Sequence, residues 1–307
     1  MNRKEFISLA GLSGVGLMLP YETWGKSAGL KNKISLAQWS MNKSFFSGKK
    51  DPVKYPALAA ELGFDGVEYV NQFYFDRLEK GSTSSKNVKA LANELNQHAN
   101  DNNIASVLIM VDREGNLSSS DSKEISNSIE QHKKWVELAA ELSCQSVRVN
   151  LSGSEDAEEW VKRSVEGLTS LSEFAKQHGL NIIVENHGGF SSNGAMLAEV
   201  MKKTNLDNCG TLPDFGNFCI KGGYGKCDDW YDPYKGVAEL MPYAKSLSAK
   251  AYNFDSDGFE TKIDYVKMMK IVKESNYKGF IGVEYEGNGL SEVDGILATK
   301  NLLEKLM

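Results

Sequence analysis

The chain has 307 residues, of which 41% are hydrophobic and 25% are charged, and its formal net charge is −6. These proportions are ordinary for a globular protein, so they argue against a disordered chain and against a protein built from membrane spans. The acidic balance, together with the lack of any stretch dense in lysine and arginine, argues against nucleic acid as a partner.

The first residues differ from the rest of the chain. A basic pair, Arg3-Lys4, precedes a short Gly-rich apolar run over residues 7–20. A basic flank with a short apolar core is typical of an export signal and is too short for a transmembrane helix. The pair before Phe6 also resembles a twin-arginine signal in which lysine replaces the second arginine. We predict a Tat-like signal over residues 1–28, a periplasmic protein and no stable membrane insertion after signal removal; the alternative is a cytoplasmic enzyme with a frayed N-terminal helix.

Short β-rich runs alternate with longer amphipathic runs over residues 29–307. Val161, Val165 and Leu168, for example, recur at helical spacing, and Ser291 has the residue type and position of a helix N-cap. Eight such alternations predict one domain, a single (β/α)₈ TIM barrel. No G-x-G-x-x-G motif follows the first strand, so a dinucleotide-binding fold has no support. The predicted strands are 33–39, 66–70, 104–111, 146–151, 181–186, 209–213, 245–251 and 280–285.

An internal repeat strengthens this prediction. Residues 63–69 (GFDGVEY) and 279–285 (GFIGVEY) differ at one position in seven. Each segment has the pattern of a helix end, a turn and a strand, which is the repeating unit of a barrel.

Polar side chains gather at the predicted carboxyl ends of the strands, which in a barrel meet at one mouth. The run 182–189 is typical, because a β-branched strand ends in polar residues and alternation puts Glu185 and His187 on one face. Acidic groups dominate the mouth, and crowded carboxylates repel one another unless a cation or a proton lies between them. The polar residues at strand ends are Gln38, Glu68, Asp112, Arg148, Asn150, Glu185, His187, Asp214, Asn217, Ser248, Lys250, Glu284 and Glu286.

Three of these acids are candidate metal ligands. Glu185, Asp214 and Glu284 each end an apolar strand. We predict that they bind one divalent cation; the alternative is a buried ion pair. Oxygen-rich ligation with at most one imidazole favours Mn²⁺, which we expect, or Mg²⁺, with Co²⁺ and Zn²⁺ as further alternatives.

The remaining candidates have roles that the residues alone leave open. Arg148, which shares a strand face with Asn150, either anchors a substrate oxygen or neutralises neighbouring carboxylates. Lys250 binds substrate, transfers a proton or pairs with an adjacent glutamate, and Glu68 contacts substrate or forms a structural salt bridge. The predicted substrate-binding residues are Gln38, Glu68, Arg148, Asn150, Asn217 and Lys250.

Histidine is scarce at the predicted mouth. His187 alone ends a strand, whereas His98, His132 and His178 lie in polar helical contexts and are predicted to be at the surface. A site that needs several imidazoles therefore cannot be built here.

The four cysteines show no C-x-x-C spacing and are too few for a disulfide scaffold. Cys219 and Cys227 flank a Gly-rich loop, where they either pair in an oxidising compartment or remain free thiols. The sequence does not decide between these two states.

Six motifs carry a resemblance to a known family: GFDGVEY (63–69), VRVN (147–150), IIVENHGG (182–189), TLPDFGNF (211–218), SAKAYNFD (248–255) and GFIGVEYEG (279–287). Together they resemble the sugar isomerase/epimerase superfamily of xylose-isomerase-like barrels, over essentially the whole chain after the predicted signal. The resemblance implies one metal held by acids on strands five, six and eight, here Glu185, Asp214 and Glu284. It also implies a strand-seven histidine, where this chain has Ser248, and a histidine three residues after the strand-six Asp, where it has Asn217.

The resemblance also implies a mechanism. The metal polarises a carbonyl and its neighbouring hydroxyl, and a carboxylate removes the adjacent proton to give an enediolate. Glu185 and Glu284 would be the acid/base pair, and His187 would bind substrate or perform the second proton transfer. We therefore predict a metal-dependent sugar isomerase or epimerase with a small carbohydrate substrate, and homo-oligomerisation stays open.

Three other functions compete with this prediction. A lyase or hydratase acting on keto-sugars or 3-keto-glycosides would use the same proton abstraction, and both export and the replaced histidines favour it. A sugar-binding barrel without catalysis is permitted by Ser248 and Asn217. A DNA-cutting barrel of the endonuclease IV type needs many histidines for its zinc ions, so the histidine content argues against it.

Overall fold

The computed structural model describes residues 33–78, 85–223 and 226–307, which belong to one compact unit spanning Asn32–Met307. The predicted export signal, residues 1–28, lies outside the described residues, so the signal and the periplasmic location stay predictions. Within the described ranges, none of the helices combines the length and the apolar character that crossing a membrane requires.

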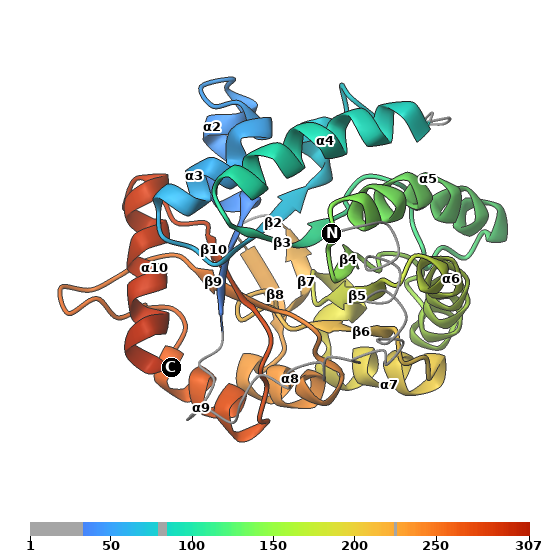
Figure 1. The fold of residues 1–307 in the computed structure, drawn as a ribbon. Coiled ribbons are helices and arrows are strands. Elements are labelled where there is room, and N and C mark those ends of the chain that lie inside the picture. The colour runs from blue at the N-terminus through green and yellow to red at the C-terminus, as the bar shows by residue number, and fades with distance from the viewer. Residues whose placement is uncertain (1–32, 79–84, 224–225) are drawn as a thin grey trace, which may run out of the picture. The chain divides into compact units, whose positions relative to one another are not determined.

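A parallel sheet of eight strands lies at the centre of this unit, with helices outside it (Figure 1). Its strands are hydrogen bonded in the order β6-β5-β4-β3-β2-β1-β10-β9, and each lies within a predicted strand. The prediction of a (β/α)₈ barrel is therefore confirmed. The strands are β1 (Ile34–Ala37), β2 (Gly66–Val70), β3 (Ala105–Met110), β4 (Ser146–Val149), β5 (Asn181–Glu185), β6 (Cys209–Leu212), β9 (Leu247–Ala251) and β10 (Ile281–Tyr285).

Backbone contacts between β6 and β9 join the two ends of this sheet. Isolated parallel bridges pair Thr211 with Ala244 and Asp214 with Ser248. The backbone N–H of Ser248 also donates to the carbonyl of Pro213 at 3.0 Å. Asp214 lies just beyond the carboxyl end of β6 and Ser248 is the second residue of β9, so the second bridge brings these two side chains together inside the closed barrel.

Helices connect the strands, and side-chain caps fix where several of them begin. Asp121, Asp156 and Ser291 each accept a hydrogen bond from a backbone N–H in the first turn of α5, α6 and α10. The predicted start of the last helix at Ser291 is therefore confirmed. The helices are α2 (Asn42–Phe46), α3 (Tyr55–Glu61), α4 (Ser85–Asp101), α5 (Ser122–Glu141), α6 (Ala157–Gln177), α7 (Gly194–Thr204), α8 (Pro233–Leu240), α9 (Tyr265–Glu274) and α10 (Glu292–Leu306).

A short antiparallel hairpin between β6 and α8 was not predicted. It consists of β7 (Cys219–Gly223) and β8 (Lys226–Trp230), and a disulfide joins Cys219 to Cys227 with a Cα–Cα distance of 5.8 Å. The pairing that the sequence left open is thus present. The residues of β8 are mostly exposed, so this hairpin lacks the buried apolar alternation by which strands are recognised in a sequence.

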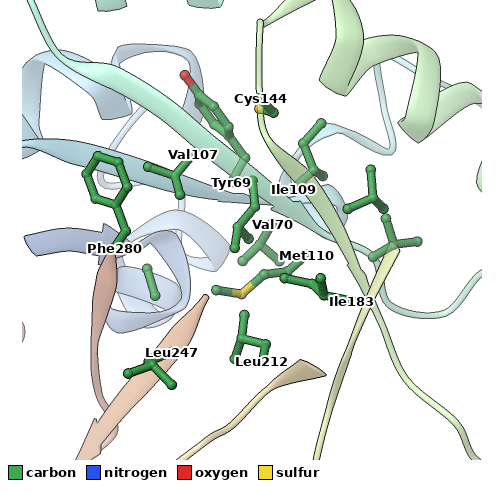
Figure 2. Packing of buried hydrophobic residues seen from close by; sticks show 14 of the residues in the cluster. Tyr69, Val70, Val107, Ile109, Met110, Cys144, Ile183, Leu212, Leu247 and Phe280 are labelled. Atoms are coloured by element: carbon green, nitrogen blue, oxygen red, sulfur yellow. The ribbon is translucent and has the colours of Figure 1, made fainter. Parts of the chain in front are cut away.

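Apolar side chains fill the barrel interior beneath the polar strand ends. Ile183 and Leu212 are fully buried, and two residues further along the chain come Glu185 and Asp214. Side chains two apart on a strand face the same way, so each acid continues an inward-facing row. Figure 2 shows Met110, Ile183 and Leu212 gathered between the strands. This apolar layer supports the polar layer above it.

The repeated segment contains a glycine that leaves room for a buried carboxyl group. A Cβ atom added at Gly282 would lie 2.4 Å from Oε1 of the fully buried Glu68. We expect Gly282→Ala to lower the free energy of unfolding by roughly 1–3 kcal/mol, as overpacking of a core does, in chemical denaturation. At Gly289 the nearest atom to such a Cβ is 3.7 Å away, so Gly289→Ala is the matched control. Equal stability of the two variants would contradict the tight packing around Glu68.

Candidate active site

Three acids that the sequence predicts as metal ligands meet at the mouth of the barrel. Glu185 ends β5, Asp214 follows β6 and Glu284 lies in β10. All three are buried, and each offers one ligand oxygen such that these oxygens lie within 4.8 Å of one another. A buried acidic cluster of this size could bind a metal ion. We call these residues the acidic triad.

Asn217 and Arg148 already engage both oxygens of Glu185. The side-chain amide of Asn217 donates to Oε1 at 3.0 Å, and Nε of Arg148 lies 3.0 Å from Oε2. Arg148 also donates from its other side to Asp112 at 2.8 Å, and Asn150 donates to the same Asp112 oxygen at 2.7 Å. Arg148 therefore neutralises two carboxylates from neighbouring strands, which is one of the two roles predicted for it.

The hydroxyl of Ser248 lies between the other two triad acids. It is 2.6 Å from Oδ2 of Asp214 and 2.8 Å from Oε2 of Glu284. The remaining oxygen of Asp214 accepts two backbone N–H groups, from Gly216 and Asn217, at 2.8 Å each. A hydroxyl has one proton to donate, so both contacts of Ser248 form at once only if one of the two carboxyl groups is protonated.

Lys250 places its ammonium group among three acids. Its Nζ lies 3.2 Å from Glu284 Oε1, 3.3 Å from Glu286 Oε1 and 3.8 Å from Asp214 Oδ2. The residue is 1% exposed, and in the β9–β10 ladder it lies directly opposite Glu284. Of the roles predicted for Lys250, the ion pair with neighbouring glutamates is present in this structure.

These contacts test whether the triad fits a divalent ion. All six carboxylate oxygens of Glu185, Asp214 and Glu284 already face a protein donor, and two of those donors, Arg148 and Lys250, are cations. Among the described residues, no imidazole belongs to the cluster. In this arrangement the residues do not fit a bound metal ion, although the acids themselves are of the predicted type. The identity of a metal and a dependence on it stay predictions.

Burial and the two cations give the triad acids different proton affinities. Burial raises the pKa of Glu185 and of Asp214 to about 7. At Glu284 the effect of burial is outweighed by the ammonium of Lys250, which lowers the pKa below its usual value. Asp214 is therefore the partner of Ser248 that more readily holds the additional proton, and Glu284 is the ionised one.

A cavity of about 600 Å³ opens over this site. Glu284 and Lys250 form part of its wall, and His187 lies exposed in it. Glu185 and Asp214 are buried behind that wall. The polar and aromatic side chains lining the cavity include Trp39, Asp112, Arg148, His187, Asn217, Lys250, Glu284 and Glu286.

Two predicted substrate-binding residues are fully buried and bond to the protein instead. Gln38 accepts a hydrogen bond from the backbone N–H of Val70 at 2.8 Å and donates to the Tyr74 hydroxyl at 2.9 Å. Glu68 accepts a hydrogen bond from the hydroxyl of Ser35 at 2.6 Å. Neither Gln38 nor Glu68 is among the described residues that line the cavity. Alternation along a strand indicates which way a side chain points, but not how deep in the barrel it lies.

The sequence did not identify Trp39 as a site residue. Its indole N–H donates to Glu286 at 2.6 Å, and both residues line the cavity. Trp39 follows β1 by two residues, so its position near a strand end was a usable signal. Glu286, one of the polar residues predicted at the strand ends, is half-buried between Trp39 and Lys250.

The prediction that His132 lies at the surface is wrong. His132 is buried in α5, and its Nδ1 is 2.7 Å from the backbone carbonyl oxygen of Ser128, one helical turn earlier. This local hydrogen bond satisfies one of the two ring nitrogens. His178 is exposed as predicted, and His98 is half-buried.

The profile of the Xylose isomerase-like TIM barrel family matches residues 56–306. The chain belongs to this family. The resemblance predicted from the strand-end motifs is thereby confirmed. A sequence comparison with curated proteins finds no match.

Solved structures with the same fold include several sugar-converting enzymes. The 3-keto-D-glucoside 4-epimerase from E. coli has a TM-score of 0.68 and 13% identity, covering 90% of this chain and all of its own. The D-psicose 3-epimerase from Clostridium cellulolyticum has a TM-score of 0.67 and 15% identity, covering 89% and 99%. A sugar phosphate isomerase/epimerase from Parabacteroides distasonis has a TM-score of 0.62 and 17% identity, covering 92% and 97%. At these identities the likeness establishes the fold.

The buried Glu68 predicts a pH dependence of stability. Burial raises its pKa from 4.5 to about 8, so the folded protein keeps this proton at pH 7 while the unfolded chain releases it above pH 4.5. Between these two values the unfolded state binds fewer protons, so stability falls as pH rises, by up to about 1.4 kcal/mol per pH unit. Glu68→Gln should remove this loss and therefore gain stability over the wild type as the pH increases from 5 to 8.

Chemical denaturation at a series of pH values measures this difference. Glu141→Gln, at an exposed position of α5, is the matched control and should follow the wild type at every pH. A constant difference between Glu68→Gln and the wild type from pH 5 to pH 8 would show that Glu68 is ionised in the folded protein.

Proposed function

We propose that the protein is a sugar isomerase or epimerase that moves a proton on a carbon next to a carbonyl group. Membership of the Xylose isomerase-like family supports this reaction class, as do the neighbouring folds named as sugar epimerases. The observation that carries the proposal is the pairing of an ionised Glu284 with Lys250 in the wall of a cavity of sugar-binding size. The substrate is a small carbohydrate.

The chemistry needs a base at the reacting C–H and positive charge at the oxygen that becomes negative. Glu284 is the base, because it is the triad acid that both stays ionised and lines the cavity. Lys250 and Arg148 line the same cavity and supply positive charge to the carbonyl and hydroxyl oxygens of the substrate. Both cations are held in place by buried acids, so no reorganisation is needed as charge develops on the substrate.

A second group must return the proton. His187 lines the cavity and lies two residues after Glu185, at the end of β5. Glu185 does not line the cavity; it accepts a hydrogen bond from Asn217, which does. We assign the return of the proton to His187, with Glu185 as the alternative donor. Return to the opposite face of the same carbon gives an epimer, and return to the neighbouring carbon gives an isomer.

The family resemblance also implies a divalent ion, with Mn²⁺ expected and Mg²⁺, Co²⁺ or Zn²⁺ as alternatives, held by Glu185, Asp214 and Glu284. The donors that already engage these acids leave no oxygen free for it. No step of the proposed mechanism therefore passes through a metal, and the side chains supply the positive charge.

Proton abstraction next to a carbonyl is measured by the exchange of substrate hydrogen for solvent deuterium. In D₂O, the wild type should introduce deuterium into a ketose such as D-psicose or D-tagatose, or into a 3-keto-glucoside, as detected by NMR. Glu284→Gln removes the base and should slow exchange at least about 100-fold. Glu185→Gln tests the alternative donor, and the exposed Glu141→Gln is the control that should keep the wild-type rate. Deuterium exchange by Glu284→Gln at the wild-type rate would contradict the assignment of Glu284 as the base.

A lyase that acts on 3-keto-glycosides is the second candidate function, and a neighbouring cavity favours it. This second cavity, of about 780 Å³, shares Asn217 and Glu286 with the first and is lined by Trp230, which is 62% exposed. A glycoside whose sugar lies over Glu284 would have room there for its second group, against the Trp230 ring. The Cys219–Cys227 disulfide also supports the proposed periplasmic location, where unphosphorylated glycosides would be met.

Aglycone release separates the two reactions. We expect a lyase to liberate nitrophenol from a nitrophenyl 3-keto-glucoside, which is measured by its absorbance. We expect Trp230→Ala to raise KM for this glycoside about tenfold. The same variant should leave KM for a free ketose unchanged, because a monosaccharide does not reach the second cavity. Epimer formation without any nitrophenol release would eliminate the lyase.

A further inference from the structure

We propose that the ammonium group of Lys250 is the resident cation of the acidic triad, and that a divalent metal ion binds there only when Lys250 is replaced. This role concerns charge balance in the site, and it holds whatever reaction the site catalyses. It explains how a barrel of this family keeps three acids together without the histidines that the resemblance leads one to expect.

The register of the sheet places Lys250 where its charge is needed. In the parallel ladder between β9 and β10, Lys250 pairs with Glu284 and Ser248 pairs with Gly282. Ser248 and Lys250 are two residues apart on β9, so both face the barrel interior with Glu284. The Ser248 hydroxyl and the Lys250 ammonium both reach Asp214 and Glu284.

Three acids surround the ammonium group. Their nearest oxygens lie within ion-pair distance of Nζ, at 3.2 Å for Glu284, 3.3 Å for Glu286 and 3.8 Å for Asp214. These acids come from β10, from the residue just after it, and from the end of β6. A single buried cation thus joins two walls of the barrel, as a metal ion does.

The remaining triad oxygens have protein partners as well. Asn217 and Arg148 engage the two oxygens of Glu185. Ser248 lies between Asp214 and Glu284 at hydrogen-bond distance from both. A metal ion that entered the triad would have to break several of these contacts and would also face the positive charge of Lys250 at close range.

Replacement of Lys250 reverses this balance. Lys250→Met keeps an unbranched side chain, one atom shorter, but leaves the acids without their nearest cation, so the vacated position attracts a divalent ion. Lys250→Arg keeps the charge and should still exclude metal. Lys270→Met is the matched control, because Lys270 is exposed to solvent on α9 and does not belong to the site.

The experiment measures Mn²⁺ binding rather than turnover. The full-length wild type and the three lysine variants are treated with a chelator, and each is titrated with MnCl₂ by calorimetry and by electron paramagnetic resonance of free Mn²⁺. We expect no stoichiometric binding to the wild type, Lys250→Arg or Lys270→Met. We expect Lys250→Met to bind one Mn²⁺, with an affinity at least about tenfold higher than any binding detected for the wild type. The bound ion should also raise the melting temperature of this variant.

Binding of one Mn²⁺ to the wild type in the micromolar range, abolished by Asp214→Asn, would overturn the proposal. So would a Lys250→Met protein that folds and binds no more Mn²⁺ than the wild type does. If Lys250→Met folds only when Mn²⁺ is present, the proposal is supported, because the ion then replaces the lost charge. If it folds neither with nor without Mn²⁺, titration of the wild type and of Lys250→Arg tests the proposal. Stoichiometric binding to either would contradict it, and the absence of binding to both would support it.

Failure of this proposal is distinguishable from failure of the proposed function. If the chelator-treated wild type neither binds Mn²⁺ nor exchanges deuterium into any sugar, the proposed role of Lys250 is supported and the proposed sugar reaction is contradicted. If the wild type binds Mn²⁺ stoichiometrically, the proposed role of Lys250 is contradicted, whether or not sugar is converted.

Discussion

The need to neutralise three buried carboxylates governs the site and much of the barrel around it. Glu185, Asp214 and Glu284 lie close enough to share one ligand position, and water cannot screen them there. Their charge is balanced by Arg148 on one side and by Lys250 on the other. Burial raises the pKa of Glu185 and Asp214, and the Ser248 hydroxyl lies between Asp214 and Glu284.

This charge balance depends on the closure of the barrel. Glu284 and Lys250 belong to neighbouring strands, so their contact is set by local register. Asp214 comes from the other edge strand of the sheet, and it reaches Lys250 only because β6 and β9 meet at the seam where Asp214 pairs with Ser248. The apolar layer below, with Ile183 and Leu212 inside, holds these strand ends at a fixed height.

We propose that this site takes its positive charge from side chains of the protein where a metal ion is expected in other barrels of the family. Family barrels are expected to hold a metal among acids and histidines, whereas this chain has Ser248 and Asn217 at the histidine positions and a lysine ammonium among the acids. A cation fixed by covalent attachment is always in place, but it carries one charge instead of two.

The sequence by itself determined the eight strands, the barrel and the residue types at its mouth, because alternation and strand ends are local properties of a chain. It correctly grouped Glu185, Asp214 and Glu284. Tertiary structure decided depth, since Gln38 and Glu68 turned out to be buried in the interior.

Tertiary structure also decided the pairing of charges. Lys250 had three open roles in the sequence, and only the distances across the closed seam place its ammonium among the acids. The hairpin over Cys219–Gly223 and Lys226–Trp230 was missed because its exposed strands carry no burial pattern. A sequence encodes which face a side chain takes, whereas contacts between distant strands depend on where the sheet closes.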